Sequence, residues 1–78
     1  MEASDPKAQR LMAMVQGHLE AGAPDLAYGV GAAGCRQFPD IAPLLELTAL
    51  AAAQSGQLDA ASQLFERAHN LEPDNTRL

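Results

Sequence analysis

Three side chains in this sequence could act as a nucleophile, a general base or a metal ligand near neutral pH: His18, Cys35 and His69. A catalytic nucleophile needs a neighbouring base, and a metal site needs three or four closely spaced ligands. These three residues are far apart in the chain and follow no known nucleophile or metal-binding spacing. The sequence therefore predicts no catalytic residue, no metal site and no cofactor, and we expect a protein that is not an enzyme, although a parent protein could carry a catalytic domain beside it.

Two other patterns resemble ligand-binding or acid–base motifs but lack essential parts. Gly29, Gly31 and Gly34 are closely spaced, yet they are not followed by the Lys-Ser or Lys-Thr pair of a phosphate-binding loop. The carboxylates of Asp40 and Glu46 are more typical of helix caps and solvated helix faces than of a catalytic pair. Neither pattern changes the expectation of a non-catalytic protein.

The composition favours a small helical domain. The chain has 78 residues and is 47% apolar, but sixteen of its residues are Ala, whereas Val, Ile and Thr together number only five. This mixture favours helices over strands. A domain of this length buries little surface on folding, so we do not expect a substrate cavity inside it.

The charge and hydropathy patterns exclude several classes of partner. The net charge is −5 and the isoelectric point is near 4.6, which disfavours binding to nucleic acid or to an anionic membrane. No apolar run approaches the roughly 18 residues of a membrane span, and the polar N-terminus lacks the apolar stretch of a signal peptide. We expect a cytoplasmic protein, although a domain cut from a secreted protein would look the same.

The sequence repeats with a period of 34 residues. The repeat aligns glycines, prolines and small residues, where backbone geometry restricts the choice of side chain. The aligned pairs are Gly22/Gly56, Asp25/Asp59, Ala27/Ala61, Pro39/Pro73, Asp40/Asp74, Ala8/Ala42, Leu11/Leu45 and Leu44/Leu78.

Each repeat is predicted to contain two helices. The first helix is capped by Ser4 or Asp5, has Pro6 in its first turn and ends at Gly22, and the second runs from Pro24 to about Gln37. The third is capped by Asp40 and ends at Gly56, and the fourth runs from about Leu58 to Leu71. The predicted fold class is all-α, with two antiparallel helical hairpins.

The second half of the chain resembles the tetratricopeptide repeat family. The residues that carry the resemblance are Leu45, Thr48, Ala49, Ala52, Gly56, Ala61, Phe65, Ala68 and Pro73. The first half matches at Leu11, Gly22, Ala27 and Pro39 but departs from the pattern at Val15, His18, Gly31 and Gly34. The resemblance implies a short right-handed solenoid, one domain over residues 1–78, with repeats at about 8–41 and 42–75 and a stub at 76–78. It also implies that Phe65 fills the space between stacked helices.

The resemblance further implies a concave groove that binds a peptide or helix of a partner protein. The residues that would line the groove are Gln9, Met12, Gln16, Leu19, Glu46, Leu50, Ala53 and Gln54. An ordinary solvated face is the alternative interpretation of these positions. Family members that clamp chaperone C-terminal carboxylates use Lys, Arg and Asn where this chain has Met12, Gln16 and Leu47, so we do not expect such tails to bind.

A second hypothesis is self-association. Two repeats are fewer than the three or so that usually form a stable stack, so the chain is expected either to belong to a larger protein or to bury its open end against another copy. The residues that would form that homodimer surface are Leu64, Phe65, Ala68 and Leu71.

The glycines at positions 29, 31 and 34 allow two interpretations. Each Gly inside a helix costs about 0.8–1 kcal/mol relative to Ala. The bare face could admit another helix or a ligand, or a bulky neighbour such as Met14, Val15 or Phe38 could fill the gap inside the fold.

Overall fold

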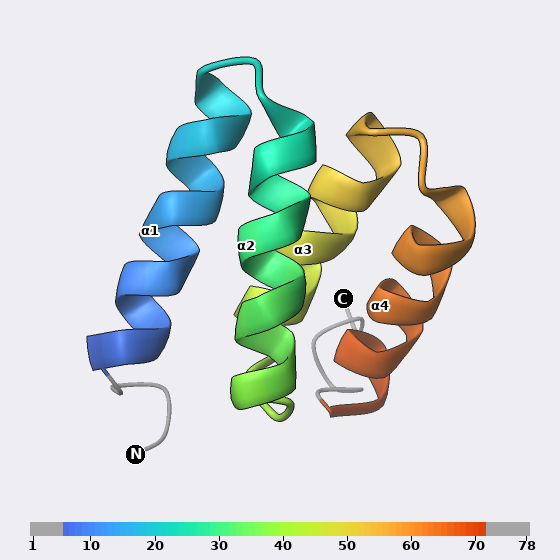
Figure 1. The fold of residues 1–78 in the computed structure, drawn as a ribbon. Helices are drawn as coiled ribbons and strands as arrows, with labels where there is room; N and C mark the ends of the chain where they lie inside the picture. Colours follow the sequence, from blue (N-terminus) through green and yellow to red (C-terminus); the bar gives the residue numbers. More distant parts are fainter. Residues whose placement is uncertain (1–5, 72–78) are drawn as a thin grey trace, which may run out of the picture.

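A computed structural model describes residues 6–71, and every regular element in that range is a helix (Figure 1). The four helices are α1 (Pro6–Glu20), α2 (Pro24–Gln37), α3 (Ala42–Gln54) and α4 (Leu58–Leu71). The predictions of an all-α fold and of these four helices are confirmed. The predicted cap at Ser4 or Asp5, the Pro73-Asp74 break and the stub at 76–78 lie outside the described residues.

The turn inside each hairpin is built around a glycine with positive φ. Gly22 has φ 78° and Gly56 has φ 88°. After Gly22, the N–H of Ala23 donates to the carbonyl of His18 at 2.8 Å, and the N–H of Gly22 itself donates to Leu19 at 3.1 Å. These two hydrogen bonds together form the Schellman motif, which satisfies the last carbonyl groups of a helix.

The second hairpin repeats this turn 34 residues later. The N–H of Gln57 donates to the carbonyl of Ala52 at 2.8 Å, and the N–H of Gly56 donates to Ala53 at 3.2 Å. The two aligned glycines of the sequence therefore occupy the same backbone conformation in the same motif.

The predicted helix cap at Asp40 is wrong. The N-cap residue of α3 is Ile41, which makes no side-chain cap hydrogen bond, and Asp40 lies one residue earlier. Ile41 is buried in the hydrophobic core. Asp40 therefore precedes the N-cap position, which is the position whose side chain accepts from the free N–H groups of the first turn.

The helices form two antiparallel pairs, α1 with α2 and α3 with α4 (Figure 1). The α3 helix contacts all three of the others, and α1 contacts α2 and α3. Seven of the thirteen residues of α3 are buried, which is the pattern of a central helix. Within the described range, α2 and α4 both pack on α3, and no Cα atom of α2 lies within 8 Å of a Cα atom of α4.

The core has two parts that meet along α3. The larger part gathers Ala8, Cys35, Ile41, Ala42, Leu44, Leu45, Ala49, Leu64 and Ala68. The smaller part gathers Val15, Ala27 and Ala51, with Leu19, Tyr28, Val30 and Leu47 packed against it. Many of these side chains are Ala, so the helix backbones approach closely and little volume is left to fill.

Two of the three closely spaced glycines on α2 face the inside of the fold. A Cβ atom at Gly31 would collide with Thr48 of α3, and one at Gly34 would lie 3.2 Å from Leu11 Cδ1. A Cβ at Gly29 would meet nothing within 4 Å. The gap at Gly31 is thus filled inside the fold, but by a threonine and not by the bulky residues that the sequence suggested.

Candidate functional site

The three side chains with catalytic or ligating potential are in separate places. His18 is half-buried in α1, His69 is exposed in the last turn of α4, and Cys35 is buried near the end of α2. Residues 6–71 contain no group of three or more His, Cys, Asp or Glu side chains that could hold a metal ion.

Cys35 takes part in a small buried hydrogen-bond chain. Its thiol donates to Thr48 Oγ1 at 3.5 Å, and the Thr48 hydroxyl donates to the carbonyl of Leu44, one turn earlier in α3, at 2.8 Å. Thr48 is fully buried, so its hydroxyl needs this partner. This pairing could not be predicted from the sequence, because residues 35 and 48 are brought together only by the packing of α2 on α3.

A groove lies between α1 and α3, with a volume of about 590 Å³, and we call it the α1–α3 groove. It is lined by Gln9, Met12, Ala13, Gln16, Pro43, Glu46, Leu47, Leu50 and Phe65. The structure thus brings together five of the eight residues predicted for the concave groove: Gln9, Met12, Gln16, Glu46 and Leu50. Their spacing within each helix, three or four residues apart, places them along one helix face.

The other three predicted residues do not line this groove. Leu19 is half-buried against the smaller part of the core. Ala53 is half-buried and Gln54 is exposed in the last turn of α3. The groove therefore stops before the C-terminal turns of α1 and α3.

Phe65 was expected to fill the space between stacked helices, and this expectation is wrong. Its side chain is 46% exposed and lines the α1–α3 groove from α4. Ala61, Leu64 and Ala68 form the buried side of α4 instead. Leu64 lies three residues after Ala61 and Phe65 lies four residues after it, so a small rotation of α4 decides which of these two large side chains is covered.

Of the four residues predicted for the self-association surface, two are buried and two are exposed. Leu64 and Ala68 are 9% and 2% exposed and belong to the core, so they are not available at the surface. Phe65 and Leu71 remain 46% and 40% exposed. Only these two of the four residues predicted for self-association are accessible to a second copy.

The groove has an apolar lining with polar groups beside it. Leu50 is 43% exposed, Phe65 is 46% exposed, and Met12 is half-buried. Gln9 and Gln16 supply amide groups, and Glu46 is the one ionisable side chain among the described residues that line it. Such a surface fits apolar side chains of a partner and offers hydrogen bonds and one negative charge for orientation.

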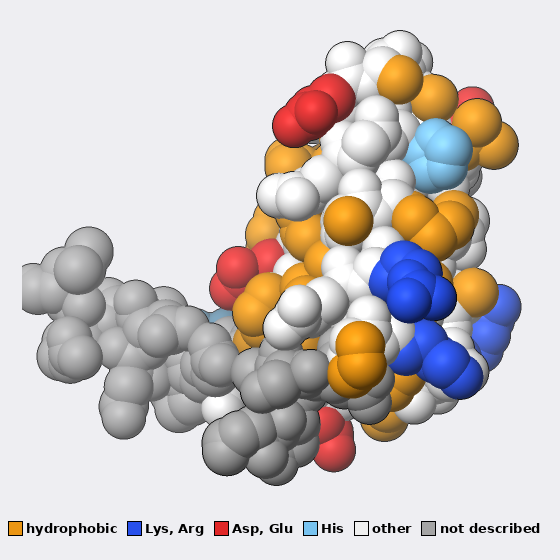
Figure 2. Space-filling view, turned by 90° about the vertical axis from the view of Figure 1, so that its left-hand side faces the viewer, with side chains coloured by type: hydrophobic (Ala, Val, Ile, Leu, Met, Phe, Trp, Pro, Cys, Tyr) orange, Lys and Arg blue, Asp and Glu red, His pale blue; other side chains and the backbone are white. Residues whose placement is uncertain are grey.

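The outer face of α1 is mixed in character (Figure 2). Hydrophobic side chains are interspersed with uncharged surface, Lys and Arg side chains gather on one part of the face, and acidic side chains lie at several separate places around it.

Among residues 6–71, no helix combines the length and the apolar character that crossing a lipid bilayer would need. Comparisons with protein-family models, with curated proteins and with solved structures find no match to this chain.

Proposed function

We propose that this protein is a non-catalytic interaction or scaffolding module of the tetratricopeptide-repeat type, which binds a segment of a partner protein in the α1–α3 groove. The observation that carries the proposal is the convergence of half-exposed apolar side chains from three helices. Met12 on α1, Leu50 on α3 and Phe65 on α4 all line one groove, with glutamine side chains beside them.

The repeated turn geometry supports the repeat interpretation. Gly22 and Gly56 have the same sign of φ and the same pair of hydrogen bonds, 34 residues apart. The two hairpins that follow from these turns pack with their first helices, α1 and α3, in contact. In a tetratricopeptide-type stack, the first helices of the repeats would line the binding face.

The lining of the groove defines the chemistry of the segment that it would bind. Burying a large apolar side chain completely gains about 1.5–3 kcal/mol, so covering Leu50 and Phe65, each nearly half exposed, would gain roughly 1 kcal/mol apiece. A partner segment with two or three apolar side chains at helical or extended spacing would cover both Leu50 and Phe65. Glu46 would favour a Lys or Arg beside them.

A free carboxylate at this site would be unfavourable. None of the described residues that line the groove is Lys, Arg or His, and Glu46 carries a negative charge. A C-terminal carboxylate would lose its hydration without gaining a cationic partner. The groove therefore fits an internal apolar segment better than an acidic chaperone tail.

The test is a selection of binding peptides followed by measurement of their affinity. Peptides from a random display library would be selected on the full chain, and the dissociation constants of the enriched peptides measured by isothermal titration calorimetry. We expect apolar peptides that carry a basic residue. We expect Met12→Ala/Leu50→Ala to weaken their binding roughly tenfold or more.

The matched control is Leu26→Ala/Leu58→Ala. These leucines are 60% and 68% exposed, lie on α2 and α4 and do not line the groove. We expect this control to bind like the unaltered protein. Equal affinities for the groove variant and the control, or enriched peptides that are mainly acidic, would refute the assignment of the groove.

Self-association is a second candidate function, favoured by the exposure of Phe65 and Leu71 on α4. Sedimentation equilibrium at high protein concentration gives the mass directly. A dimer that becomes a monomer in Phe65→Ser supports assembly through this part of α4. A monomer with cooperative unfolding removes this candidate.

A further inference from the structure

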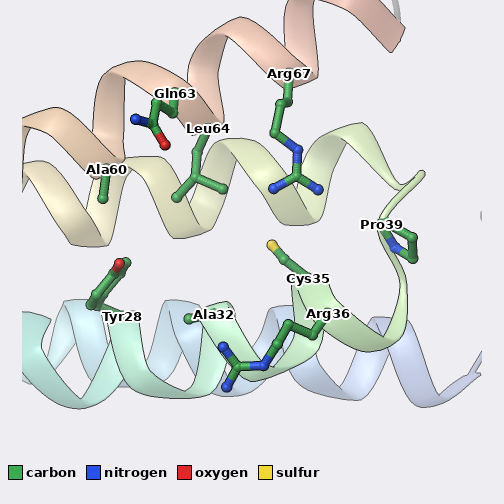
Figure 3. Close-up of a pocket in the computed structure, with 9 residues that line it drawn as sticks. All are labelled: Tyr28, Ala32, Cys35, Arg36, Pro39, Ala60, Gln63, Leu64 and Arg67. Atoms are coloured by element: carbon green, nitrogen blue, oxygen red, sulfur yellow. The ribbon is translucent and has the colours of Figure 1, made fainter.

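A second cleft, between α2 and α4, has a different chemical character from the α1–α3 groove (Figure 3). Its volume is about 520 Å³. Arg36 of α2 and Arg67 of α4 both line it, and the sulfur of Cys35 lies between the two side chains in this view. Within the described range, no Cα atom of one of the two helices that form its walls lies within 8 Å of a Cα atom of the other.

The cleft concentrates positive charge on an acidic protein. The whole chain has five Lys and Arg residues against ten Asp and Glu, and two of the five line this single cleft. None of the described residues that line it is acidic. Neither guanidinium group forms an ion pair within residues 6–71. The carboxylate residue Asp40 lines a smaller adjoining pocket together with Arg67.

The rest of the lining supplies further donors above an apolar base. Tyr28 contributes a hydroxyl group and Gln63 a side-chain amide. Cys35 and Leu64 are 4% and 9% exposed, so the base of the cleft is poorly solvated. Electrostatic attraction is stronger next to such a low-dielectric base than in open water.

We propose that this cleft binds a compact oxyanion, a phosphate or a carboxylate group, between Arg36 and Arg67. A guanidinium group is planar and donates two parallel hydrogen bonds to such an anion, so two of them on opposite walls can hold it from both sides. The ligand is compact because the net charge of −5 repels an extended polyanion, whereas a single group entering the cleft experiences mainly the two nearby arginines.

The experiment is an NMR titration of the full chain, labelled with ¹⁵N, at constant ionic strength. Inorganic phosphate is the first probe, succinate the second, and sodium chloride the non-specific control. We expect phosphate or succinate to shift the amide resonances around Tyr28, Cys35, Gln63 and Arg67 along saturating curves. The relative affinities of the two probes distinguish a phosphoryl ligand from a carboxylate ligand.

The variants are Arg36→Gln, Arg67→Gln and, as the matched control, Arg10→Gln. Arg10 is an exposed cation of α1 that does not line the cleft. We expect each cleft variant to weaken the affinity for the better probe roughly tenfold, whereas Arg10→Gln leaves it unchanged. Linear shifts equal to those caused by chloride, or equal losses in Arg10→Gln and the cleft variants, would overturn the proposal.

Discussion

Replacing Gly31 by alanine tests how closely α2 packs on α3. An added Cβ would lie 2.9 Å from both Cβ and Cγ2 of Thr48, and closer still to its hydroxyl oxygen. Thr48 is fully buried, and its Cβ is attached directly to the backbone of α3, so a rotation of the side chain cannot remove the overlap. The two helices must move apart or tilt if the alanine is to fit.

The magnitude follows from two opposing terms. Alanine is favoured over glycine inside a helix by about 0.8–1 kcal/mol. Forcing an extra methyl group into a packed core costs about 1–3 kcal/mol, and the upper half of this range applies because the overlap involves backbone-linked atoms. We therefore expect Gly31→Ala to lower the free energy of unfolding by about 1–2 kcal/mol, which is a large share of the roughly 4–12 kcal/mol typical of a domain of 78 residues.

Gly29→Ala is the matched control, because it makes the same chemical change in the same helix. A Cβ at position 29 meets nothing within 4 Å, so only the helix-propensity gain applies. We expect Gly29→Ala to raise the free energy of unfolding by about 0.8–1 kcal/mol. For a domain of this size each kcal/mol moves the melting temperature by about 4–8 °C, so the two variants should melt on opposite sides of the unaltered protein.

The assay is chemical and thermal unfolding followed by circular dichroism at the helical band. A double-mutant cycle with Thr48→Ala assigns the cause, because this change removes the hydroxyl and methyl groups nearest to the added Cβ. We expect the Gly31→Ala loss to be smaller by about 1 kcal/mol in the Thr48→Ala background. If Gly31→Ala stabilises the protein as much as Gly29→Ala, the close approach of α2 and α3 described above is wrong.

Gly22→Ala and Gly56→Ala should each lower the free energy of unfolding by about 1–2 kcal/mol, since both glycines have positive φ; denaturation curves no different from the unaltered protein would contradict this. Cys35, which is 4% exposed and donates to Thr48, should react with Ellman's reagent far more slowly in the folded protein than in denaturant; similar rates in both would show that the thiol is accessible. Leu44→Ala should lower the free energy of unfolding by about 2–5 kcal/mol, because Leu44 is fully buried. Leu58→Ala, at a residue that is 68% exposed, should change it by only about 0.5 kcal/mol. Similar losses of stability in the melting curves of the two variants would argue against the described core.

The positions of the helices could be predicted from the sequence because local chemistry sets them. Gly22 and Gly56 are adjacent to helix ends, where only a residue without a side chain adopts positive φ at low cost. Pro24 and Pro43 lie in the first turns of α2 and α3, where the missing N–H group has no partner to lose. Asp40 is the exception, because the buried Ile41 occupies the N-cap position of α3.

The lining of the groove could be predicted only in part. Helical spacing places Gln9, Met12 and Gln16 on one face of α1, and it places Glu46 and Leu50 on one face of α3. Both faces line the groove. Phe65 could not have been predicted as a groove residue from the sequence of α4, because α4 reaches the groove only by packing on α3. The family resemblance implied a position between stacked helices for Phe65, but the rotation of α4 that covers Leu64 instead is set by contacts that are distant in sequence.

The helical content and the turn positions follow from the sequence alone, because they depend on propensities and backbone conformations within a few residues. The 34-residue repetition is read directly from the aligned residues. The tertiary structure decided which side of each helix is covered. The rotation and spacing of separate helices set the Gly31–Thr48 contact, the burial of Cys35 and the exposure of Phe65. They also place Arg36 and Arg67 on the same cleft. A helix presents several plausible faces, and only packing against a neighbour selects one of them.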